Sequence, residues 1–467
     1  MFPISYNAYK FMHDFSRALS DAHYKGMRVD VDYCRAQQKH IERRVSFLES
    51  QMSKCEEGKV WKTMYGGKLN WDSTQQQVDV LIKNMGHASD KKTAKQNISI
   101  DEEVLRGMNI DFTKFLLERK KLSKASGTYL KNLIDETVDG YVHPVYNLHL
   151  VITYRSSADS PPIQQIPIHD DMIAQIIRRA FVTEKGYMMM EADFKGAEVR
   201  VSACNHGDPV MANYIMDEKT DMHLDTAKQC FMLTDDLITK ENKKDIKFFG
   251  KNNFVFAEFY GSWFLSCARA LWKSIHEKEV VLGNGQTIIQ HLSSKGITKL
   301  GELFKVRGKW ETEKGTFIEH IKKVEDDFWN NRFKVYKQWK IEHFEKYQNQ
   351  GYFDMFTGFR CSGVMGFNDA VNYPIQGPSF HCLGWVFIKV SEWIKENKLK
   401  TKVIGQIHDS IIMYVHPSEV SYVYERMKQM IEVELMQAWK WITIPMKADF
   451  EATPVDGSWY DKKALEI

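Results

Sequence analysis

The sequence predicts a mixed α+β fold in which many helices surround a small antiparallel sheet. Most of the chain has apolar residues at helical spacing, but two short runs, residues 186–194 and 402–415, are rich in strand-forming residues. His-Asp-Ser interrupts the second run at its centre, which predicts a hairpin of two strands. We find no internal repeat and no low-complexity tract that would alter this prediction.

The first third of the chain is predicted to be mainly helical. Apolar spacing indicates helices within residues 7–56, with Asp30 or Asp32 as an N-cap, and one helix over residues 111–138. Between them, residues 57–100 are rich in Lys, Gly and Asn, which favours loops and short helices. A strand-like pattern follows, and the segment S-P-P-I-Q-Q-I-P ends it.

The remaining two thirds alternate helices with the two strand-forming runs. A helix is predicted to follow the first run directly, and a long helix is predicted to stop at Gly351. The predicted elements are helices over 197–205, 220–275, 324–350, 379–398 and 418–439, with an insertion of short mixed elements at 276–325.

Composition limits the class of protein. A chain of 467 residues is long enough for about three domains. Its 43% hydrophobic and 13% aromatic residues exclude wholesale disorder. The formal net charge is only +3, so a surface for nucleic acid would require the 64 basic and 61 acidic residues to be segregated.

Cysteine usage and the N-terminus predict the compartment. The seven Cys include no C-x-x-C pair, which favours reduced thiols and no structural zinc. The N-terminus lacks a basic segment followed by an apolar one, and no run approaches the roughly 20 apolar residues of a membrane span. We therefore expect a soluble cytoplasmic protein with no membrane partner.

Two carboxylates carry most of the functional information. Asp193 and Asp409 each stand where an apolar run meets polar residues. Taken alone, each is more often an ordinary strand-end or turn residue. As a pair they have the chemistry of a two-metal phosphoryl-transfer site, in which carboxylates hold two Mg²⁺ ions about 3.5–4 Å apart.

The residues around these acids resemble the motifs of family A DNA polymerases. D-F-K-G-A-E-V-R, which begins at Asp193, is similar to the family's D-Y-S-Q-I-E-L-R, and I-H-D-S is similar to its H-D-E. N-Y-P-I-Q-G, R-S-S-A-D-S-P-P-I-Q-Q-I-P and K-T-D-M-H-L-D-T-A-K-Q-C-F resemble three further motifs. K-G-M-R-V-D-V-D-Y and S-G-T-Y-L-K-N-L look like thumb-side sequences. The motifs are collinear and cover nearly the whole chain.

The resemblance implies a right-hand polymerase of phage type with no exonuclease domain. Its expected parts are a thumb with N-terminal helices (1–130), a palm (131–210 and 366–467) and helical fingers (211–365) that carry the insertion. The implied activity is template-directed, primer-dependent DNA synthesis from dNTPs, without proofreading by this chain. Primer-template DNA and dNTPs are the expected partners, and a separate exonuclease or processivity subunit is a candidate partner.

The resemblance also assigns roles to individual residues. Asp193 and Asp409 would hold two Mg²⁺ ions, for which Mn²⁺ is an expected substitute, and the main-chain carbonyl of Phe194 is a candidate ligand. Glu198 would be the steric gate against a ribonucleotide 2′-hydroxyl. The implied nucleotide-binding residues are Glu198, His223, Lys247, Lys251, Phe256 and Tyr260.

One of these assignments stays open within the sequence. The separation from Lys251 to Tyr260 is one residue longer than the family's usual separation. Phe256 is the platform aromatic if the extra residue precedes it, and Phe254 is the platform aromatic otherwise. We prefer Phe256.

The implied DNA contacts fall into two groups. One group would contact the duplex near the primer terminus, and the other would form the basic face of a helix that grips the backbone. The residues are Arg155, Gln164, Asn372, Gln376 and His408 in the first group, and Lys120, Lys124 and Thr128 in the second.

Ser410 departs from the family, which has a glutamate at that position. A similar His-Asp-Ser occurs in single-subunit RNA polymerases, so such an enzyme is the first alternative. The presence of Glu198 favours DNA synthesis over this alternative. A catalytically inactive DNA-binding accessory subunit is the second alternative, and the retained Asp193, Asp409, Lys247 and Lys251 speak against it.

Overall fold

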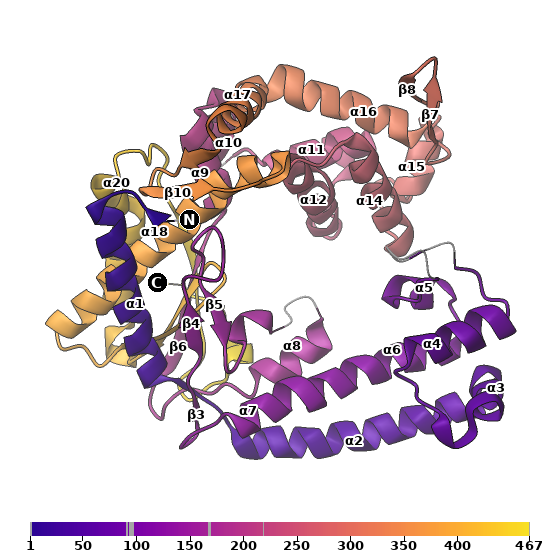
Figure 1. Cartoon of the computed structure of the whole chain (residues 1–467), viewed down its shortest axis with the longest axis horizontal. Helices are drawn as coiled ribbons and strands as arrows, with labels where there is room; N and C mark the ends of the chain where they lie inside the picture. The colour runs from indigo at the N-terminus through magenta and orange to yellow at the C-terminus, as the bar shows by residue number, and fades with distance from the viewer. Residues whose placement is uncertain (1, 90–91, 93–97, 167–169, 218, 467) are drawn as a thin grey trace.

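A sheet layer carries two helical lobes. The computed structural model describes residues 2–89, 92, 98–166, 170–217 and 219–466. Figure 1 shows the sheet layer on the left and the two lobes extending to the right. We call residues 31–135 the lower lobe and residues 208–350 the upper lobe.

The sheet layer contains the predicted antiparallel sheet, and the predicted hairpin is confirmed. Its strands run antiparallel in the spatial order β11 (Lys402–Ile407), β12 (Ser410–Val415), β6 (Met188–Phe194), β13 (Ala448–Ala452) and β14 (Lys463–Ala464). β6 lies between β12 and β13, so the strand that carries Asp193 is central. Every residue of β12 is buried.

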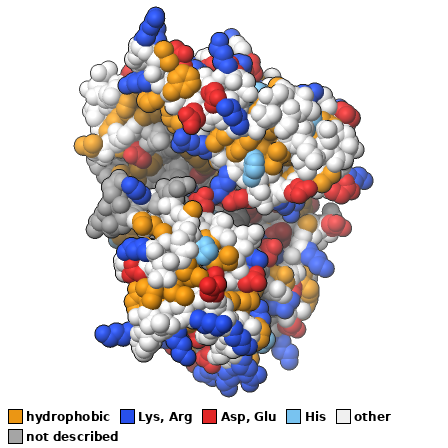
Figure 2. All heavy atoms as spheres, turned by 90° about the vertical axis from the view of Figure 1, so that its right-hand side faces the viewer, with side chains coloured by type: hydrophobic (Ala, Val, Ile, Leu, Met, Phe, Trp, Pro, Cys, Tyr) orange, Lys and Arg blue, Asp and Glu red, His pale blue; other side chains and the backbone are white. Residues whose placement is uncertain are grey.

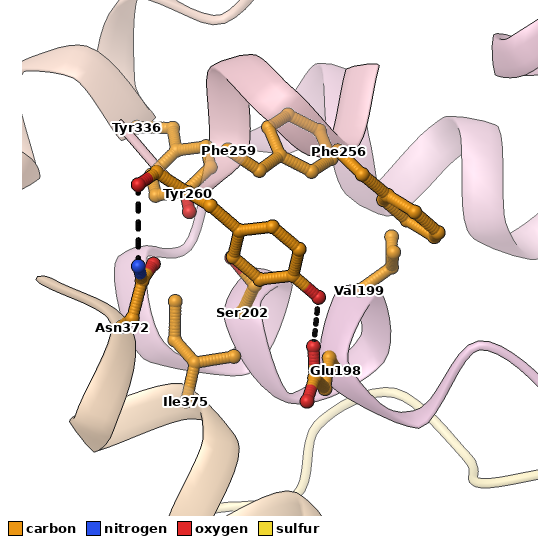
Figure 3. Close-up of a pocket in the computed structure, with 9 residues that line it drawn as sticks. All are labelled: Glu198, Val199, Ser202, Phe256, Phe259, Tyr260, Tyr336, Asn372 and Ile375. Carbon is orange, nitrogen blue, oxygen red and sulfur yellow. Dashed lines mark hydrogen bonds between the residues drawn. The ribbon is translucent and has the colours of Figure 1, made fainter. Parts of the chain in front are cut away.

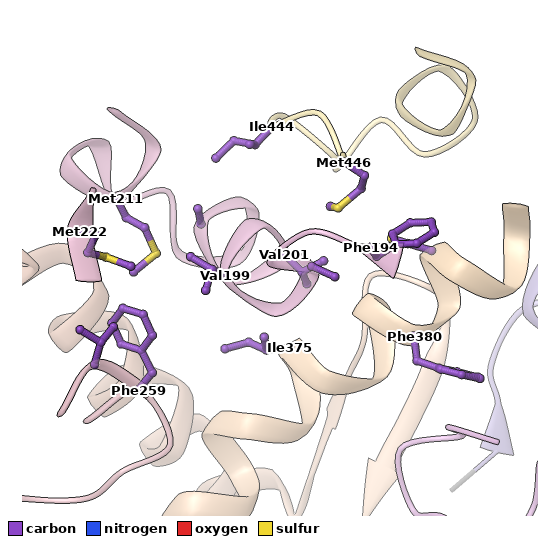
Figure 4. Close-up of a cluster of buried hydrophobic side chains, with 14 of the residues drawn as sticks. Phe194, Val199, Val201, Met211, Met222, Phe259, Ile375, Phe380, Ile444 and Met446 are labelled. Carbon is purple, nitrogen blue, oxygen red and sulfur yellow. The ribbon is translucent and has the colours of Figure 1, made fainter. Parts of the chain in front are cut away.

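The two faces of this sheet enter different hydrophobic cores, as alternation along strands requires. Met190 and Met413 pack with α1 (Tyr6–Lys25) and α18 (Phe367–Glu396) on one face. Met189 and Tyr414 pack on the other face. The first core continues through α9 (Ala197–His206) to the base of the upper lobe. Figure 4 shows Phe194 and Phe380 on one side of this core, Met211 and Phe259 on the other, and Val201 between them.

Shorter elements flank the sheet layer. They are β1 (Phe2–Pro3), β2 (Met27–Arg28), β3 (Tyr141–Val142), β4 (Val145–Asn147), β5 (Ser157–Asp159), η4 (Ile163–Gln165), α8 (Asp171–Arg178), β9 (Tyr352–Asp354), β10 (Phe359–Ser362), η8 (Pro417–Glu419), α19 (Val420–Gln429), η9 (Met430–Glu434), α20 (Leu435–Ala438) and η10 (Trp459–Asp461).

The lower lobe is a pair of long helices with a small helical tip. α2 and α6 pack side by side, and the tip has its own core around Trp61, Trp71 and Phe112. The elements are α2 (Val31–Lys54), α3 (Glu56–Tyr65), η1 (Gly66–Lys68), α4 (Thr74–Gln77), η2 (Val78–Asn84), α5 (Glu102–Gly107), α6 (Asp111–Lys124), η3 (Ala125–Leu130) and α7 (Lys131–Asp135). The predicted helix from residue 111 therefore contains a π-helical segment, η3.

The upper lobe is helical apart from one hairpin at its outer end. Its elements are α10 (Pro209–Met216), α11 (Met222–Phe231), η5 (Asp235–Leu237), α12 (Lys243–Gly250), η6 (Lys251–Val255), α13 (Phe256–Phe259), α14 (Phe264–Glu277), α15 (Ile288–Ser294), β7 (Leu303–Val306), β8 (Lys309–Thr312), α16 (Phe317–Asp327), η7 (Phe328–Arg332) and α17 (Lys334–Gln350). An ion pair of 2.6 Å between Lys273 and Glu103 joins the two lobes at their outer ends.

The prediction of one helix over residues 324–350 is wrong. The helix breaks at Phe333, whose φ of −109° and ψ of 45° are not helical. Phe333 is fully buried, and the carboxylate of Asp208 accepts the backbone N–H of Tyr336 at 3.1 Å in the first turn of α17. Tertiary contacts therefore begin a new helix here. The predicted stop at Gly351 is confirmed by its left-handed conformation.

Helix α18 extends further towards the N-terminus than predicted. It begins at Phe367 and contains Pro374 and Pro378, which normally break a helix. Because Pro378 has no N–H, it frees the carbonyl of Pro374, and the side-chain amide of Asn205 donates to that carbonyl at 2.8 Å. A contact from another helix thus replaces the missing backbone bond.

The surface has mixed charge, as the small net charge requires. Figure 2 views the outer ends of the lobes and shows basic, acidic and hydrophobic side chains interspersed, with Lys and Arg gathered at the lower edge. Within the described ranges, no helix combines the length and the apolar character needed to cross a bilayer. All seven Cys are free thiols.

Candidate active site

The sheet brings the two predicted acids together. Asp193 is near the end of β6, and Asp409 lies in the two-residue turn between β11 and β12. The backbone N–H of Phe194 donates to the carbonyl of Asp409 at 3.0 Å, and Ser410 is the cross-strand partner of Asp193. Two acids far apart in sequence are therefore neighbours at one end of the sheet.

The electrostatics of this pair favour a bound cation. Loss of water around the Asp193 carboxyl raises its pKa to about 6; the charges of Glu191 and Asp409 add to this increase, and a hydrogen bond from Ser410 opposes it. A positive ion beside such acids would favour their ionised forms. Two carboxylates at an exposed strand end provide the oxygen ligands that Mg²⁺ prefers.

The described residues contain no group of three or more His, Cys, Asp or Glu arranged to hold a metal. The fit to Mg²⁺ therefore rests on Asp193 and Asp409 alone. Glu191 lies close by, but one of its carboxylate oxygens accepts hydrogen bonds from Lys462 and Trp459 and the other accepts one from Ser410. The side chain of Phe194 is buried in the core, and its carbonyl stays a predicted ligand.

Arg155 links the acid pair to the predicted gate residue. One guanidinium nitrogen lies 3.5 Å from Asp409 Oδ1 and another lies 3.3 Å from Glu198 Oε1. Glu198 also accepts a hydrogen bond from the hydroxyl of Tyr260. Burial raises the pKa of Glu198, while the bonds from Tyr260 and Arg155 oppose that increase.

A pocket beside these residues is lined by the predicted nucleotide-binding aromatics. Figure 3 shows the Tyr260 ring pointing towards Glu198, with Phe256 on the same helical segment. The side-chain amide of Asn372 donates to the carbonyl of Tyr260 at 3.2 Å, which ties α18 to this wall. The lining residues are Glu198, Val199, Ser202, Phe256, Phe259, Tyr260, Tyr336, Asn372 and Ile375.

Comparison with known proteins identifies the family. The model for "DNA polymerase family A" matches residues 32–279 and 329–460, well over half of the chain. The chain belongs to DNA polymerase family A.

Relatives extend well beyond this chain. It is 24% identical over 450 residues to DNA polymerase I of Chloroflexus aurantiacus, covering 93% of this chain and 41% of the relative. The identity to DNA polymerase I of Bacillus subtilis is 26% over 446 residues, covering 94% and 44%. A DNA polymerase of Bacillus phage SP01 is 24% identical over 382 residues, covering 79% and 37%. The chain thus spans less than half the length of these curated relatives.

A solved structure confirms the fold. The POL domain of Pol1 from M. smegmatis, in complex with DNA primer-template and dNTP, superposes with a TM-score of 0.73. The match covers 96% of this chain and 70% of that one at 18% sequence identity. The α+β right-hand architecture expected from the sequence is therefore the architecture of this family A chain.

A π-helical segment accommodates the extra residue between Lys251 and Tyr260. η6 lies in that interval, and a π-helical turn lets a helix absorb one added residue while α-helix continues on both sides. Phe254 is fully buried against Phe328, with ring centroids 5.4 Å apart. Phe256 instead lines the pocket. The structure therefore places Phe256, the preferred aromatic, on the pocket wall.

Two of the predicted phosphate-binding residues, Lys251 and His223, lie next to this wall. Lys251 Nζ is 5.2 Å from the centre of the Phe256 ring, and the His223 ring is 5.4 Å from it. Lys247 forms an ion pair of 2.7 Å with Asp221. Burial, together with the charge of Lys251, lowers the pKa of His223 to about 4, so His223 is neutral at physiological pH.

Among the predicted DNA contacts, Gln164 and His408 belong to one hydrogen-bonded group with Ser156 and Gln406, and Gln376 is bonded separately. Gln164 Nε2 donates to Ser156 at 2.9 Å and to Gln406 at 2.8 Å. Gln376 accepts a hydrogen bond of 3.3 Å from Thr153. His408 occupies the turn beside Asp409 with a positive φ of 51°. Of these three residues, His408 is the direct chain neighbour of Asp409.

The predicted basic face of the lower lobe is not uniform. Lys120 donates to the buried Gln77 at 2.8 Å, and burial lowers its pKa. Lys124 is exposed, with its Nζ 5.7 Å from the ring centre of Tyr129. Thr128 is exposed within η3. Lys120 therefore differs from the other two residues, because it is partly buried and bonded to Gln77.

Sequence reasoning missed Glu191. It stands two residues before Asp193 in a strand, so both side chains point to the same face of the sheet. That spacing was a visible signal. Its partners Trp459 and Lys462 could not be found in this way, because they are more than 260 residues away in the chain.

Proposed function

We propose that this family A chain is a DNA-directed DNA polymerase that extends a primer with dNTPs on a DNA template. One observation carries the proposal: Arg155 joins Asp409 to Glu198, so the acid pair and the aromatic pocket form one continuous site. The M. smegmatis POL domain, whose structure is a complex with DNA primer-template and dNTP, supports it.

The residues have distinct roles in this proposal. Asp193 and Asp409 hold two Mg²⁺ ions, which when bound lower the pKa of the primer 3′-hydroxyl and neutralise the triphosphate. Lys247, Lys251 and His223 orient the triphosphate, which requires Lys247 to exchange its partner Asp221 for phosphate. Phe256 and Tyr260 provide the surface for the incoming base.

Glu198 and the polar residues near the acids select the correct substrate. Glu198 occupies the space of a ribonucleotide 2′-hydroxyl. Asn372, Gln376, His408, Arg155 and Gln164 contact the primer-template near its terminus, where minor-groove acceptors are shared by all base pairs. The lower lobe acts as the thumb, the upper lobe as the fingers and the sheet layer as the palm, with boundaries near residues 130, 210 and 365.

Primer extension tests the proposal. Wild-type protein with Mg²⁺ is given a primed DNA template and either dNTPs or rNTPs, and we expect extension with dNTPs only. Asp409→Asn should reduce extension by about a thousandfold or more, because charge stabilisation worth several kcal/mol is lost, while duplex binding is retained. Preference for rNTPs would favour an RNA polymerase, and unchanged extension by Asp409→Asn would refute the catalytic assignment.

A further inference from the structure

Ser410 connects two carboxylates on the same face of the sheet. Its hydroxyl lies 2.8 Å from Asp193 Oδ1 and 2.8 Å from Glu191 Oε1. The family has a glutamate at the position of Ser410, whereas this chain has a serine there and an acid, Glu191, on the neighbouring strand β6. In this chain the Ser410 hydroxyl therefore contacts both Asp193 and the carboxylate of Glu191.

Glu191 is itself fixed from the opposite side. Its second oxygen accepts hydrogen bonds from Trp459 Nε1 at 3.0 Å and from Lys462 Nζ at 2.6 Å. Ser410 contacts one carboxylate oxygen, and Trp459 and Lys462 contact the other, so the Glu191 side chain is held in a fixed place next to Asp193.

A purely structural role for Glu191 explains only part of this geometry. A buried ion pair with Lys462 would tie β6 to the C-terminal segment whether or not Oε1 faced Ser410. Here Oε1 faces Ser410, which has only one hydrogen to share between the two acids. Within the described part of the chain, Asp193 Oδ2 has no hydrogen-bond partner, so one oxygen is held and the other is open.

We propose that Glu191 is a positioning residue that acts through Ser410 to orient the Asp193 carboxylate for a divalent cation. This inference rests on the proposed function, because it concerns the same metal-binding acids. Carboxylates that bind metals depend on the groups that hydrogen-bond them, and loss of such a group weakens metal binding. In this chain Glu191, Ser410, Trp459 and Lys462 form that supporting set.

Direct metal binding tests the proposal without turnover. Binding of Mn²⁺ alone to the whole chain, without DNA or nucleotide, is measured from the electron paramagnetic resonance signal of free Mn²⁺. We expect Glu191→Gln and Ser410→Ala each to weaken binding about tenfold or more. Ser410→Ala deletes only one hydroxyl, and thermal unfolding of each variant confirms that it is folded.

Glu451→Gln is the matched control. Glu451 lies directly across from Glu191 on β13 and contacts Lys462 at 2.6 Å, but it has no contact with Ser410 in the described structure. We expect this exposed charge to change Mn²⁺ binding by less than about twofold. If Glu451→Gln weakened Mn²⁺ binding equally, the loss of any nearby negative charge would explain the effect, and the proposal would be overturned. Unchanged Mn²⁺ binding in Ser410→Ala would also overturn it.

The Mg²⁺ requirement of primer extension, compared with KM for dNTP, provides the second readout. In primer extension, Glu191→Gln and Ser410→Ala should raise the Mg²⁺ concentration for half-maximal rate by the same factor as Mn²⁺ binding, with little change in KM for dNTP. An equal rise in KM for dNTP would contradict positioning of the metal ligand. If the wild-type chain does not extend primers, the proposed function fails, whereas the Mn²⁺ comparison still decides the role of Glu191.

Discussion

The hydroxyl of Tyr260 donates a hydrogen bond to the carboxylate of Glu198. These residues come from different segments, one at the end of α13 and the other in the first turn of α9. Arg155 contacts the same carboxylate from the side of the acid pair. Glu198 is therefore held at the junction of the pocket and the acids, where a bulky group could exclude a ribose 2′-hydroxyl.

Shortening Glu198 should relax sugar selection. Glu198→Ala removes the carboxylate from the pocket wall, so we expect kcat/KM for rNTP relative to dNTP to rise about 10- to 100-fold, the range that small steric differences in a pocket produce. The measurement is single-nucleotide extension with each substrate. Glu198→Gln keeps the bulk and should keep the selectivity, and an unchanged ratio in Glu198→Ala would rule out the gate.

The two phenylalanines around the π-helical segment should behave oppositely. Phe254→Ala leaves a cavity against Phe328 and should lower the free energy of unfolding by about 3–5 kcal/mol. Phe256→Ala removes a stacking surface in the pocket and should raise KM for dNTP about tenfold, since base stacking on an aromatic is worth about 1–3 kcal/mol. Denaturant unfolding and steady-state kinetics on both variants check this, and the reverse pattern would assign Phe254 to the nucleotide.

Substitutions of Lys120 and Lys124 should have different effects on DNA binding and on stability. Lys124→Ala removes an exposed charge, so we expect weaker duplex binding and a slope of log K against log salt that is smaller by about one. Lys120→Ala leaves the buried Gln77 without its donor and should cost about 1–3 kcal/mol of stability, with a nearly unchanged salt slope. Binding titrations at several salt concentrations decide between them. Equal salt slopes for the two variants would mean that both lysines contact the DNA backbone, as first predicted.

Local patterns predicted the elements that carry the chemistry. The run ending at Asp193 and the hairpin around Asp409 were visible because strands alternate and a short polar interruption favours a turn. A small antiparallel sheet with both acids was predicted from these runs, but the order of its strands was not. Hydrophobic spacing alone does not specify which strands become neighbours.

The features that escaped prediction depend on contacts distant in sequence. The break at Phe333 depends on Asp208, and the continuation of α18 through Pro374 depends on Asn205. The support of Asp193 by Glu191 needs Lys462 near the C-terminus. In each case the decisive partner lies more than a hundred residues away, beyond the reach of local propensity.

A pair of hydrogen-bonded carboxyls, Glu258 and Glu325, predicts a pH-dependent stability. The carboxyls of Glu258 and Glu325 hydrogen-bond each other, while Trp329 and Cys267 donate to Glu258. Burial, reinforced by the charge of Glu258, raises the pKa of Glu325 from 4.5 to about 8. Between pH 4.5 and about 8 the folded state therefore holds a proton that the unfolded state has released. The contribution of Glu325 to the free energy of unfolding is complete below pH 4.5 and declines as the pH rises to about 8.

Glu325→Gln removes one carboxyl of the pair and should reduce this dependence of the free energy of unfolding on pH. Relative to wild type, the free energy of unfolding of the variant should increase between pH 5 and pH 8, by at most about 1.4 kcal/mol per pH unit for one proton and by less because the group keeps some contact with solvent. Denaturant unfolding at a series of pH values measures this difference. Glu319→Gln on the same helix is the control, because hydrogen bonds from the N–H of Gly315 and from Lys323 lower the pKa of Glu319. The difference in free energy of unfolding between this variant and wild type should not change with pH above pH 5. A flat difference for Glu325→Gln as well would mean that both glutamates are ionised in the folded protein, which the hydrogen bond between Glu258 and Glu325 opposes.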